Sequence, residues 1–261
     1  MNRSGGSPCR VRETPVNRAQ CPRGEPSRIN FVLTVSGLIL GLLYLFMTYR
    51  TGFIIILLFW GPSLLRAQDD WRLKTDKDGI AVYTKLFPGS KFKAIKVDVE
   101  LDATLSQLVA VILDVNTGAE WVYSTKSSVL LKQVSPSELY YYSEVSIPWP
   151  AANRDFIAQL KAVQDPRTKV VTIYGPVFPD YLPEKKDIVR VRHSEGKWVI
   201  TPAGSHHVKV EYTLRADPGG DLPAWLVNMF VTKGPYESFK KLKEQLKKPG
   251  YVNAKLPFVT D

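Results

Sequence analysis

The sequence feature that most constrains the fold is a long amphipathic stretch between residues 217 and 248. Its apolar residues recur at spacings of three and four, which is typical of a helix with one buried face. These residues are Leu222, Trp225, Leu226, Met229, Phe230, Tyr236, Phe239, Leu242 and Leu246. Pro223 suits the first turn of this helix, and Gly234-Pro235 predicts a kink or a short restart midway. A helix of this kind needs an apolar surface to cover its buried face.

Alternating apolar and polar residues predict that surface as a sheet. The alternation is clearest at 95–101 and 208–214, where every second side chain is apolar. Strands are predicted at 80–86, 92–101, 128–134, 139–147, 154–163, 169–174, 187–193, 197–201 and 206–216. A capping box at Thr104 and Gln107 opens a helix with an apolar stripe, and a shorter helix or turn follows near Trp121.

This order of elements predicts an α+β fold in which one curved antiparallel sheet wraps around the long C-terminal helix. A sheet with this many strands curls, and the amphipathic helix is the element apolar enough to lie across its concave face. The space between the sheet and the helix is where we expect a ligand to bind.

The first 68 residues differ sharply in composition from the rest of the chain. They contain eight arginines and no lysine, whereas the remainder contains 21 lysines and six arginines. Residues 1–28 are rich in Arg, Pro, Gly and Ser, and are predicted to be disordered or to result from a wrongly assigned translation start. Residues 29–68 are predicted to be a hydrophobic membrane anchor or a signal peptide, which leaves 69–261 as the folded domain.

Two interpretations of residues 29–68 remain open. In the first, the 21 uncharged residues 29–49 form a transmembrane signal anchor, with the Arg-rich tail in the cytoplasm. In the second, which we favour, translation starts at Met47, residues 52–60 are the apolar core of a signal peptide, and cleavage leaves Gln68 at the mature N-terminus. Both interpretations predict a membrane-anchored or secreted protein whose main domain is extracytoplasmic, in the periplasm.

Composition and motifs argue against several classes of function. More than half of the net charge of +10 comes from residues 1–68, so the main domain is mildly basic and is not predicted to bind nucleic acid. The histidines are His193, His206 and His207, and neighbours on a strand face opposite ways, so no metal site is predicted. The sequence has no phosphate-binding loop and no nucleophile elbow. We therefore expect a binding protein without catalytic residues, metal or cofactor.

Three motifs in order are typical of one known family. Residues 219–228, GGDLPAWLVN, followed by Pro235 and Phe239, are similar to that family's G-x-x-P-x-W-L-x-N … P-x-x-F/L helix start. Residues 153–157, NRDFI, are similar to its R-D-F-V strand, and residues 183–185, PEK, precede the matching next strand. Residues 71–251 therefore resemble the START family, the lipid-transfer domains related to steroidogenic acute regulatory protein, in a bacterial-type single-domain form. Trp121 stands where the family's helix-end tryptophan is expected.

The resemblance implies a helix-grip fold with a tunnel that is closed by the C-terminal helix and a neighbouring loop. The family binds one hydrophobic lipid, commonly a sterol, a phospholipid or a ceramide. Exposing a ~16-carbon chain to water would cost roughly 13 kcal/mol, at about 0.8 kcal/mol per methylene, so a carrier must enclose nearly all of it. The implied lid is the loop 175–186 with the first half of the final helix, hinged at Gly219-Gly220 and Gly234. The implied partners are a lipid ligand and a membrane surface, and we expect a monomer.

Strand parity and the resemblance together give a set of candidate lipid contacts. Phe156, Ala158 and Leu160 share one face of the predicted strand 154–163 with Arg154. A buried arginine needs a partner, so Arg154 is expected to meet a lipid head group or a carboxylate, with a salt bridge at the rim as the alternative. The full set is Tyr141, Ser143, Arg154, Phe156, Ala158, Leu160, Val189, Tyr212, Trp225, Leu226 and Met229. For the tyrosines, ordinary core packing is the alternative role.

The sequence departs from the family pattern at one charged pair, and it leaves open the role of the C-terminal lysines and an enzymatic alternative. Some family members bury a second arginine with an acidic partner, but these positions here read Leu160 and approximately Tyr141, so this charged pair and sterol recognition are not carried over. The lysines between 240 and 248 either attract anionic lipid or form the solvated face of the helix. An enzyme on the same scaffold, such as a cyclase or aromatase, is the alternative function, because a fold does not choose between them.

Overall fold

The computed structural model describes residues 71–90 and 92–261, together with Gly41 and Leu43. The chain divides between Arg66 and Ala67 into two units, and the fold below is that of the second. The predicted tail at 1–28 and the predicted anchor or signal peptide at 29–68 lie outside the described residues, apart from Gly41 and Leu43. Among the described helices, none is both long and apolar enough to cross a membrane.

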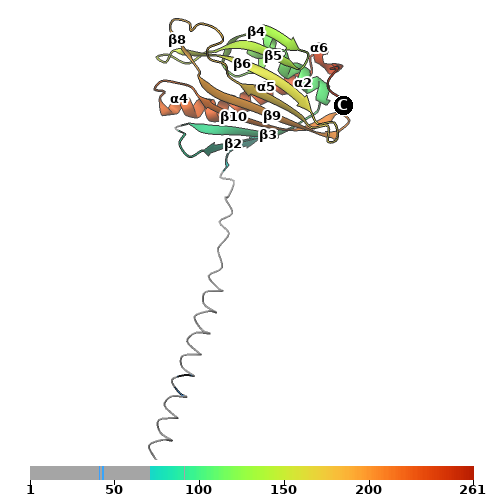
Figure 1. The fold of residues 1–261 in the computed structure, drawn as a ribbon, viewed down its shortest axis with the longest axis horizontal. Helices are drawn as coiled ribbons and strands as arrows, with labels where there is room; N and C mark the ends of the chain where they lie inside the picture. The colour runs from blue at the N-terminus through green and yellow to red at the C-terminus, as the bar shows by residue number, and fades with distance from the viewer. Residues whose placement is uncertain (1–40, 42, 44–70, 91) are drawn as a thin grey trace, which may run out of the picture. The chain divides into compact units, whose positions relative to one another are not determined.

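A long, curved and mostly antiparallel sheet is the framework of the domain (Figure 1). Across the described residues its strands are β1 (Arg72–Lys77), β2 (Ile80–Leu86), β3 (Lys93–Leu101), β4 (Thr125–Ser135), β5 (Glu138–Val145), β6 (Asn153–Gln164), β7 (Val171–Pro176), β8 (Ile188–Arg190), β9 (His193–Gly204) and β10 (His207–Asp217). Nine of them follow the spatial order β1-β2-β3-β10-β9-β7-β6-β5-β4, and β8 pairs with β6. The predicted hairpins β4–β5 and β6–β7 are both present.

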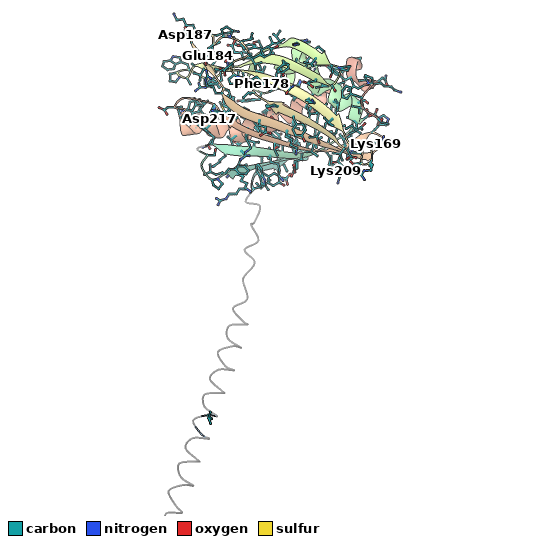
Figure 2. The ribbon with its side chains drawn as sticks, in the orientation of Figure 1. Lys169, Phe178, Glu184, Asp187, Lys209 and Asp217 are labelled. Atoms are coloured by element: carbon teal, nitrogen blue, oxygen red, sulfur yellow. The ribbon has the colours of Figure 1, made fainter. Side chains whose placement is uncertain are left out.

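The region around β8 differs from the prediction. The sequence predicts one strand at 187–193, whereas the structure has the three-residue β8 and then the start of β9 at His193. β8 runs parallel to β6, with Val189 opposite Arg154. This pairing is available because β7 pairs with β6 at residues 161–164 and leaves the first residues of β6 to β8. Hydrophobic periodicity cannot reveal it, since it depends on where the loop 177–187 returns to the sheet; Phe178, Glu184 and Asp187 of this loop are labelled in Figure 2.

The helical elements are short apart from two. They are α2 (Leu105–Leu113), a 3-10 turn (Val115–Thr117), α3 (Gly118–Trp121), α4 (Ala224–Asn228), a π-helical turn (Met229–Lys233), α5 (Gly234–Gln245) and α6 (Pro249–Val252). The predicted capping box opens α2. Oγ1 of Thr104 accepts from the N–H of Gln107 at 3.1 Å, and the Gln107 side chain accepts from the N–H of Thr104 at 3.4 Å.

The C-terminal amphipathic stretch changes helix type at the predicted break. α4 passes into the π-helical turn, and α5 begins at Gly234. Pro235 has no N–H and cannot donate to the carbonyl four residues earlier, so a regular α-helix cannot continue through it unchanged. The wider π turn accommodates this break and rotates the side chains of α4 relative to those of α5.

The hydrophobic core lies where β2, β3, β9 and β10 meet α2 and α5. Leu108 on α2 and Phe239 and Leu242 on α5 are fully buried there. The side-chain amide of Gln107 donates to the carbonyl of Leu246 at 2.8 Å and ties α2 to the end of α5. The helices are therefore fixed over one part of the sheet, and a cavity remains between the sheet and the C-terminal helical segment.

Candidate functional site

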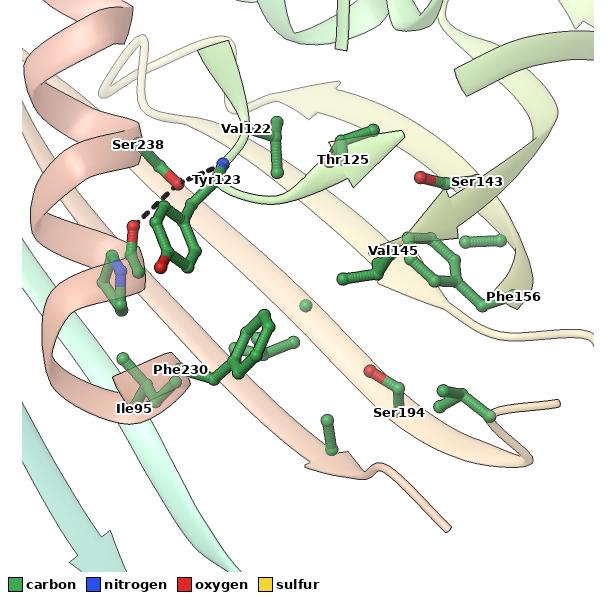
Figure 3. Close-up of a pocket in the computed structure, with 18 of the residues that line it drawn as sticks. Ile95, Val122, Tyr123, Thr125, Ser143, Val145, Phe156, Ser194, Phe230 and Ser238 are labelled. Atoms are coloured by element: carbon green, nitrogen blue, oxygen red, sulfur yellow. Dashed lines mark hydrogen bonds between the residues drawn. The ribbon is translucent and has the colours of Figure 1, made fainter. Parts of the chain in front are cut away.

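A cavity of about 380 Å³ lies between the sheet and the C-terminal helical segment. Side chains of β3 to β7, β9 and β10 form one wall, and α3, α4, the π turn and α5 form the other. Figure 3 shows Ser143 and Phe156 on the sheet side and Phe230 and Ser238 on the helical side. The volume is typical of a small-molecule pocket.

Alternate residues of each strand form the floor of the cavity, because successive side chains on a strand point to opposite faces. On β6 they are Arg154, Phe156, Ala158 and Leu160, the set that strand parity predicts. The neighbouring strands add Tyr141, Ser143, Val145, Gly175, Ser194, Gly196, Trp198, Tyr212, Leu214 and Ala216. Most of these side chains are apolar or small, so the floor is suited to hydrocarbon.

Phe230 of the π turn reaches into the cavity from the helical side (Figure 3). It packs edge-on against Tyr123, with ring centroids 5.7 Å apart. The N–H of Tyr123 donates to Oγ of Ser238 at 2.9 Å, which fixes the start of β4 against α5. At Gly234 an added Cβ would lie 3.2 Å from the Tyr123 ring, so a side chain there would force the ring to shift by a few tenths of an ångström. Tyr123 therefore holds the helical wall in place through its contacts with Phe230 and Ser238.

The predicted contacts divide into two groups. Those that line the cavity are Tyr141, Ser143, Arg154, Phe156, Ala158, Leu160 and Tyr212. Those that do not are Val189, Trp225, Leu226 and Met229. On the helical side the cavity is lined by Leu222, Val227, Phe230, Val231, Gly234, Pro235, Ser238 and Phe239. Of these, Leu222, Phe230 and Phe239 belong to the predicted apolar stripe. The prediction that Val189, Trp225, Leu226 and Met229 line the cavity is therefore wrong.

The four residues outside the lining have different surroundings. Trp225 is 54% exposed, whereas Leu226 is 1% exposed. Val189 lies on the short parallel strand β8, where it contacts the chain near Gly219: a Cβ on that glycine would be 3.2 Å from Cγ1 of Val189. Val189 therefore supports the segment that leads into α4.

Arg154 is buried at one end of the cavity, with 5% of its surface exposed. Its Nε donates to the carbonyl of Pro218 at 3.2 Å, one Nη to the carbonyl of Gly219 at 2.9 Å, and the other to the carbonyl of Ala152. The expected carboxylate partner is replaced by these three backbone acceptors. Burial lowers the pKa of Arg154, because it disfavours the charged form. Arg154 thus joins the loop 146–152 to the segment that precedes α4.

A second buried arginine, which the sequence pattern does not indicate, lies on the other face of the sheet. Arg190 pairs with Asp155 at 2.7 Å, and both side chains are 1% exposed. The charged pair that some family members carry is replaced in the cavity by Leu160 and Tyr141, as the sequence predicts. The signal for Arg190 was weak, because its partner Asp155 is 35 residues away in sequence and β8 is short.

Trp121, Trp198 and Phe239, which are not among the predicted contacts, also line the cavity. Trp198 packs on Tyr212 with ring centroids 4.4 Å apart, and on Phe239 at 5.4 Å. Trp121, 7% exposed, meets Trp198 edge-on at 6.4 Å. Strand parity along β9 points to Trp198, whereas nothing in the sequence indicates that Tyr123 lines the cavity. In the described part of the chain, no three His, Cys, Asp or Glu side chains gather in a way that could hold a metal ion.

A model of the START domain family matches residues 64–250, which include every residue of the cavity wall. The chain belongs to the START domain family. An uncharacterized protein of Pseudomonas aeruginosa is 31% identical over 180 residues, covering 69% of this chain and 88% of that protein. The mouse phosphatidylcholine transfer protein is 28% identical over 177 residues, covering 66% of this chain and 81% of that protein.

Solved structures agree with the START fold described above. A STAR-related lipid transfer protein fragment from Xanthomonas axonopodis is 33% identical with a TM-score of 0.64, covering 69% of this chain and 100% of that one. Human STARD10 is 23% identical with a TM-score of 0.59, covering 69% of this chain and 74% of that one. The predicted α+β helix-grip fold is confirmed.

Proposed function

We propose that this START domain binds one lipid in the cavity between its sheet and its C-terminal helical segment, and transfers or senses that lipid. The observation that carries the proposal is the mostly apolar cavity of about 380 Å³ under the helix. An apolar chain gains about 0.8 kcal/mol per methylene by leaving water, so such a wall favours hydrocarbon over polar ligands. The mouse phosphatidylcholine transfer protein and the Xanthomonas axonopodis structure are both named for lipid transfer, which supports a carrier over the enzymatic alternative.

The gate of the cavity is the segment from Gly219 to the π turn. Gly219 and Gly220 both have positive φ, 68° and 63°, a conformation that glycine adopts without strain and that suits a hinge. The π turn at the other end of α4 is a second place where the helix can bend. Arg154 holds the closed position through the carbonyls of Pro218 and Gly219. In this proposal the loop 177–187 stays fixed, because Arg190 binds three of its carbonyls.

The surface next to this gate meets the membrane. Trp149 is 89% exposed at the tip of the loop 146–152, and Trp225 is 54% exposed at the start of α4. Both segments adjoin Arg154, which binds the carbonyl of Ala152 on one side and that of Gly219 on the other. Tryptophan is favoured at the boundary between lipid and water, because its ring is apolar and its N–H is polar. The protein acts as a monomer in this arrangement.

The protein acts outside the cytoplasm, either anchored by residues 29–49 or released after cleavage before Gln68. The basis is the composition of residues 1–68, with its uncharged runs and its arginine bias. N-terminal sequencing of the mature protein separates the two forms. A terminus at Gln68 supports cleavage, and an intact Met1 supports the anchor.

Native mass spectrometry of the full chain, purified from its source without added lipid, tests the binding function. The expected spectrum contains the protein with one bound lipid, which organic extraction removes and which liposomes of the same extract restore. A protein that stays empty in both conditions contradicts the proposal. If the empty protein converts a polyketide substrate, the enzymatic alternative takes its place.

A further inference from the structure

Two tyrosine hydroxyls open into the cavity without hydrogen-bond partners. Tyr141 comes from β5 and Tyr212 from β10, and both belong to the cavity wall. Both side chains are partly buried and pack against the core, and in the described part of the chain neither hydroxyl has a hydrogen-bond partner. Hydroxyls in apolar surroundings are normally paired, so two unpaired ones in one cavity require an explanation.

Small residues leave room beside these hydroxyls. Gly196 on β9 pairs with Gly175 on β7, and Ala158 on β6 lies directly opposite Tyr141. A Cβ at Gly196 would lie 3.6 Å from Oη of Tyr212, so the hydroxyl stands over a residue with no side chain. The glycines and the alanine therefore leave space beside the two hydroxyls, where a polar atom of a ligand could reach them.

Packing fixes both rings before any ligand arrives. Tyr212 packs against both Trp198, at 4.4 Å, and Phe239, at 5.9 Å, and these two rings also contact each other. Tyr141 packs edge-on against Phe156 at 5.7 Å. Binding does not have to immobilise these side chains, so a hydrogen bond to either hydroxyl carries little entropic penalty.

The surroundings of the two hydroxyls are uncharged. The charged residues among the described cavity-lining residues are Lys93, Asp114 and Arg154. Asp114 accepts from the hydroxyl of Tyr251 at 2.7 Å, and Arg154 is bound to backbone carbonyls. Burial raises the pKa of both tyrosines, and Tyr141 raises that of Tyr212 further. Both phenols therefore remain neutral donors. An ionised group of a ligand would have no residue of opposite charge beside these two hydroxyls.

We propose that Tyr141 and Tyr212 form a neutral hydrogen-bonding subsite that receives an uncharged oxygen of the lipid, either a hydroxyl or an ester or ketone carbonyl. This inference rests on the proposed lipid-binding function and narrows its ligand class. A lipid that places such an oxygen between the two rings satisfies both donors, whereas a pure hydrocarbon leaves them unpaired. A lipid that places an ionised group there loses hydration without gaining a counter-charge.

The test compares oleyl alcohol, methyl oleate, oleate and octadecene as probes on the full-length protein. Binding is followed by tryptophan fluorescence, because Trp198 contacts Tyr212. The wild type should bind the alcohol and the ester more tightly than octadecene or oleate. The double variant Tyr141→Phe/Tyr212→Phe should keep its octadecene affinity and lose preference for the alcohol by on the order of tenfold, with each single variant between.

Tyr142→Phe is the matched control. It removes a phenol from the same strand, but Tyr142 faces the other side of the sheet, where Lys185 lies 4.1 Å from its ring centroid. This variant should keep the wild-type preference. A wild type that binds none of the probes overturns the lipid-binding function itself. A wild type that binds them all, with a preference that survives both tyrosine substitutions or that favours oleate, overturns the subsite alone.

Discussion

Asp155 and Arg190 form a two-point ion pair on the face of the sheet that points away from the cavity. Nε of Arg190 donates to Oδ1 of Asp155 at 2.7 Å, and Nη2 donates to Oδ2 at 3.1 Å. The other Nη, together with Nη2, donates to three carbonyls in the loop 177–187. One arginine therefore fastens both β8 and this loop to β6. Of the two parts of the proposed lid, the loop is therefore bound to the sheet through Arg190, and the segment before α5 is the part proposed as the gate.

Asp155→Ala should lower the free energy of unfolding by about 3–5 kcal/mol, because it leaves the guanidinium of Arg190 buried without a counter-charge. Urea denaturation followed by circular dichroism measures the loss. Arg192→Ala is the control, since Arg192 pairs with Asp180 and Glu184 at the surface, where an ion pair contributes less than about 1 kcal/mol. If both variants lost the same free energy of unfolding, burial would not explain the contribution of the Asp155–Arg190 pair.

Arg154→Lys should make lipid leave the cavity faster. A lysine ammonium cannot reach the carbonyls of Ala152, Pro218 and Gly219 together as the planar guanidinium does, so the closed segment loses part of its fastening. Stopped-flow release of a fluorescent lipid into acceptor vesicles measures the rate. Arg215→Lys is the control, because Arg215 lies over the ring of Phe87 at 3.9 Å, a contact that lysine can keep. An unchanged release rate would contradict the role of Arg154 in closure.

Replacing Trp149 and Trp225 by alanine should slow lipid transfer between vesicles several-fold and leave equilibrium lipid binding unchanged. The reason is that both side chains are exposed and lie outside the cavity wall. Vesicle transfer assays and native mass spectrometry measure the two quantities on the same variant. Tyr174→Ala serves for comparison, since Tyr174 is 42% exposed on a strand face that points away from the cavity. Loss of binding in the tryptophan variant would mean that these residues contact the lipid directly.

His207 should make the stability of the domain depend on pH. Its ring nitrogens lie 3.0 Å from Glu100 and 3.0 Å from Asp102, and hydrogen bonds to these two carboxylates raise the pKa of His207 above its ordinary value of about 6.5. Its contribution is therefore fully present below pH 6.5 and disappears as the pH rises through the raised pKa. The melting temperatures of the wild type and His207→Gln should differ below pH 6.5 and converge as the pH rises through the raised pKa of His207. A difference that grows with pH would contradict this assignment.

Much of the fold was predictable because its signals are local. The capping box at Thr104, the β4–β5 and β6–β7 hairpins and the alternation in β3 and β10 depend on residues that are neighbours in sequence. The sheet side of the cavity follows from the same alternation, since parity alone assigns Phe156, Ala158 and Leu160 to the wall. Each of these features follows from the side-chain period alone, which is two residues on a strand and 3.6 on a helix.

The features that escaped prediction depend on residues far apart in sequence. The apolar stripe predicts Trp225, Leu226 and Met229 as lipid contacts, but the stripe does not show which of its residues meet the cavity, and in the structure these are Leu222 and Phe230, joined by Val227. The parallel pairing of β8 and the Asp155–Arg190 contact depend on the path of the loop 177–187. The backbone partners of Arg154 leave no trace in sequence, because any residue supplies a carbonyl.

Gly196→Leu should abolish lipid uptake while the domain remains folded. The backbone at Gly196 is an ordinary strand, and a Cβ there meets Tyr212 at 3.6 Å, so the new side chain fits at its base and extends into the cavity. Gly204→Leu is the matched control, because Gly204 ends the same strand beside His207 and outside the cavity wall. Circular dichroism should give similar spectra for both variants, and native mass spectrometry should find lipid on Gly204→Leu alone. Lipid bound at wild-type levels to a folded Gly196→Leu protein would mean that the ligand does not occupy the floor between Tyr141 and Tyr212.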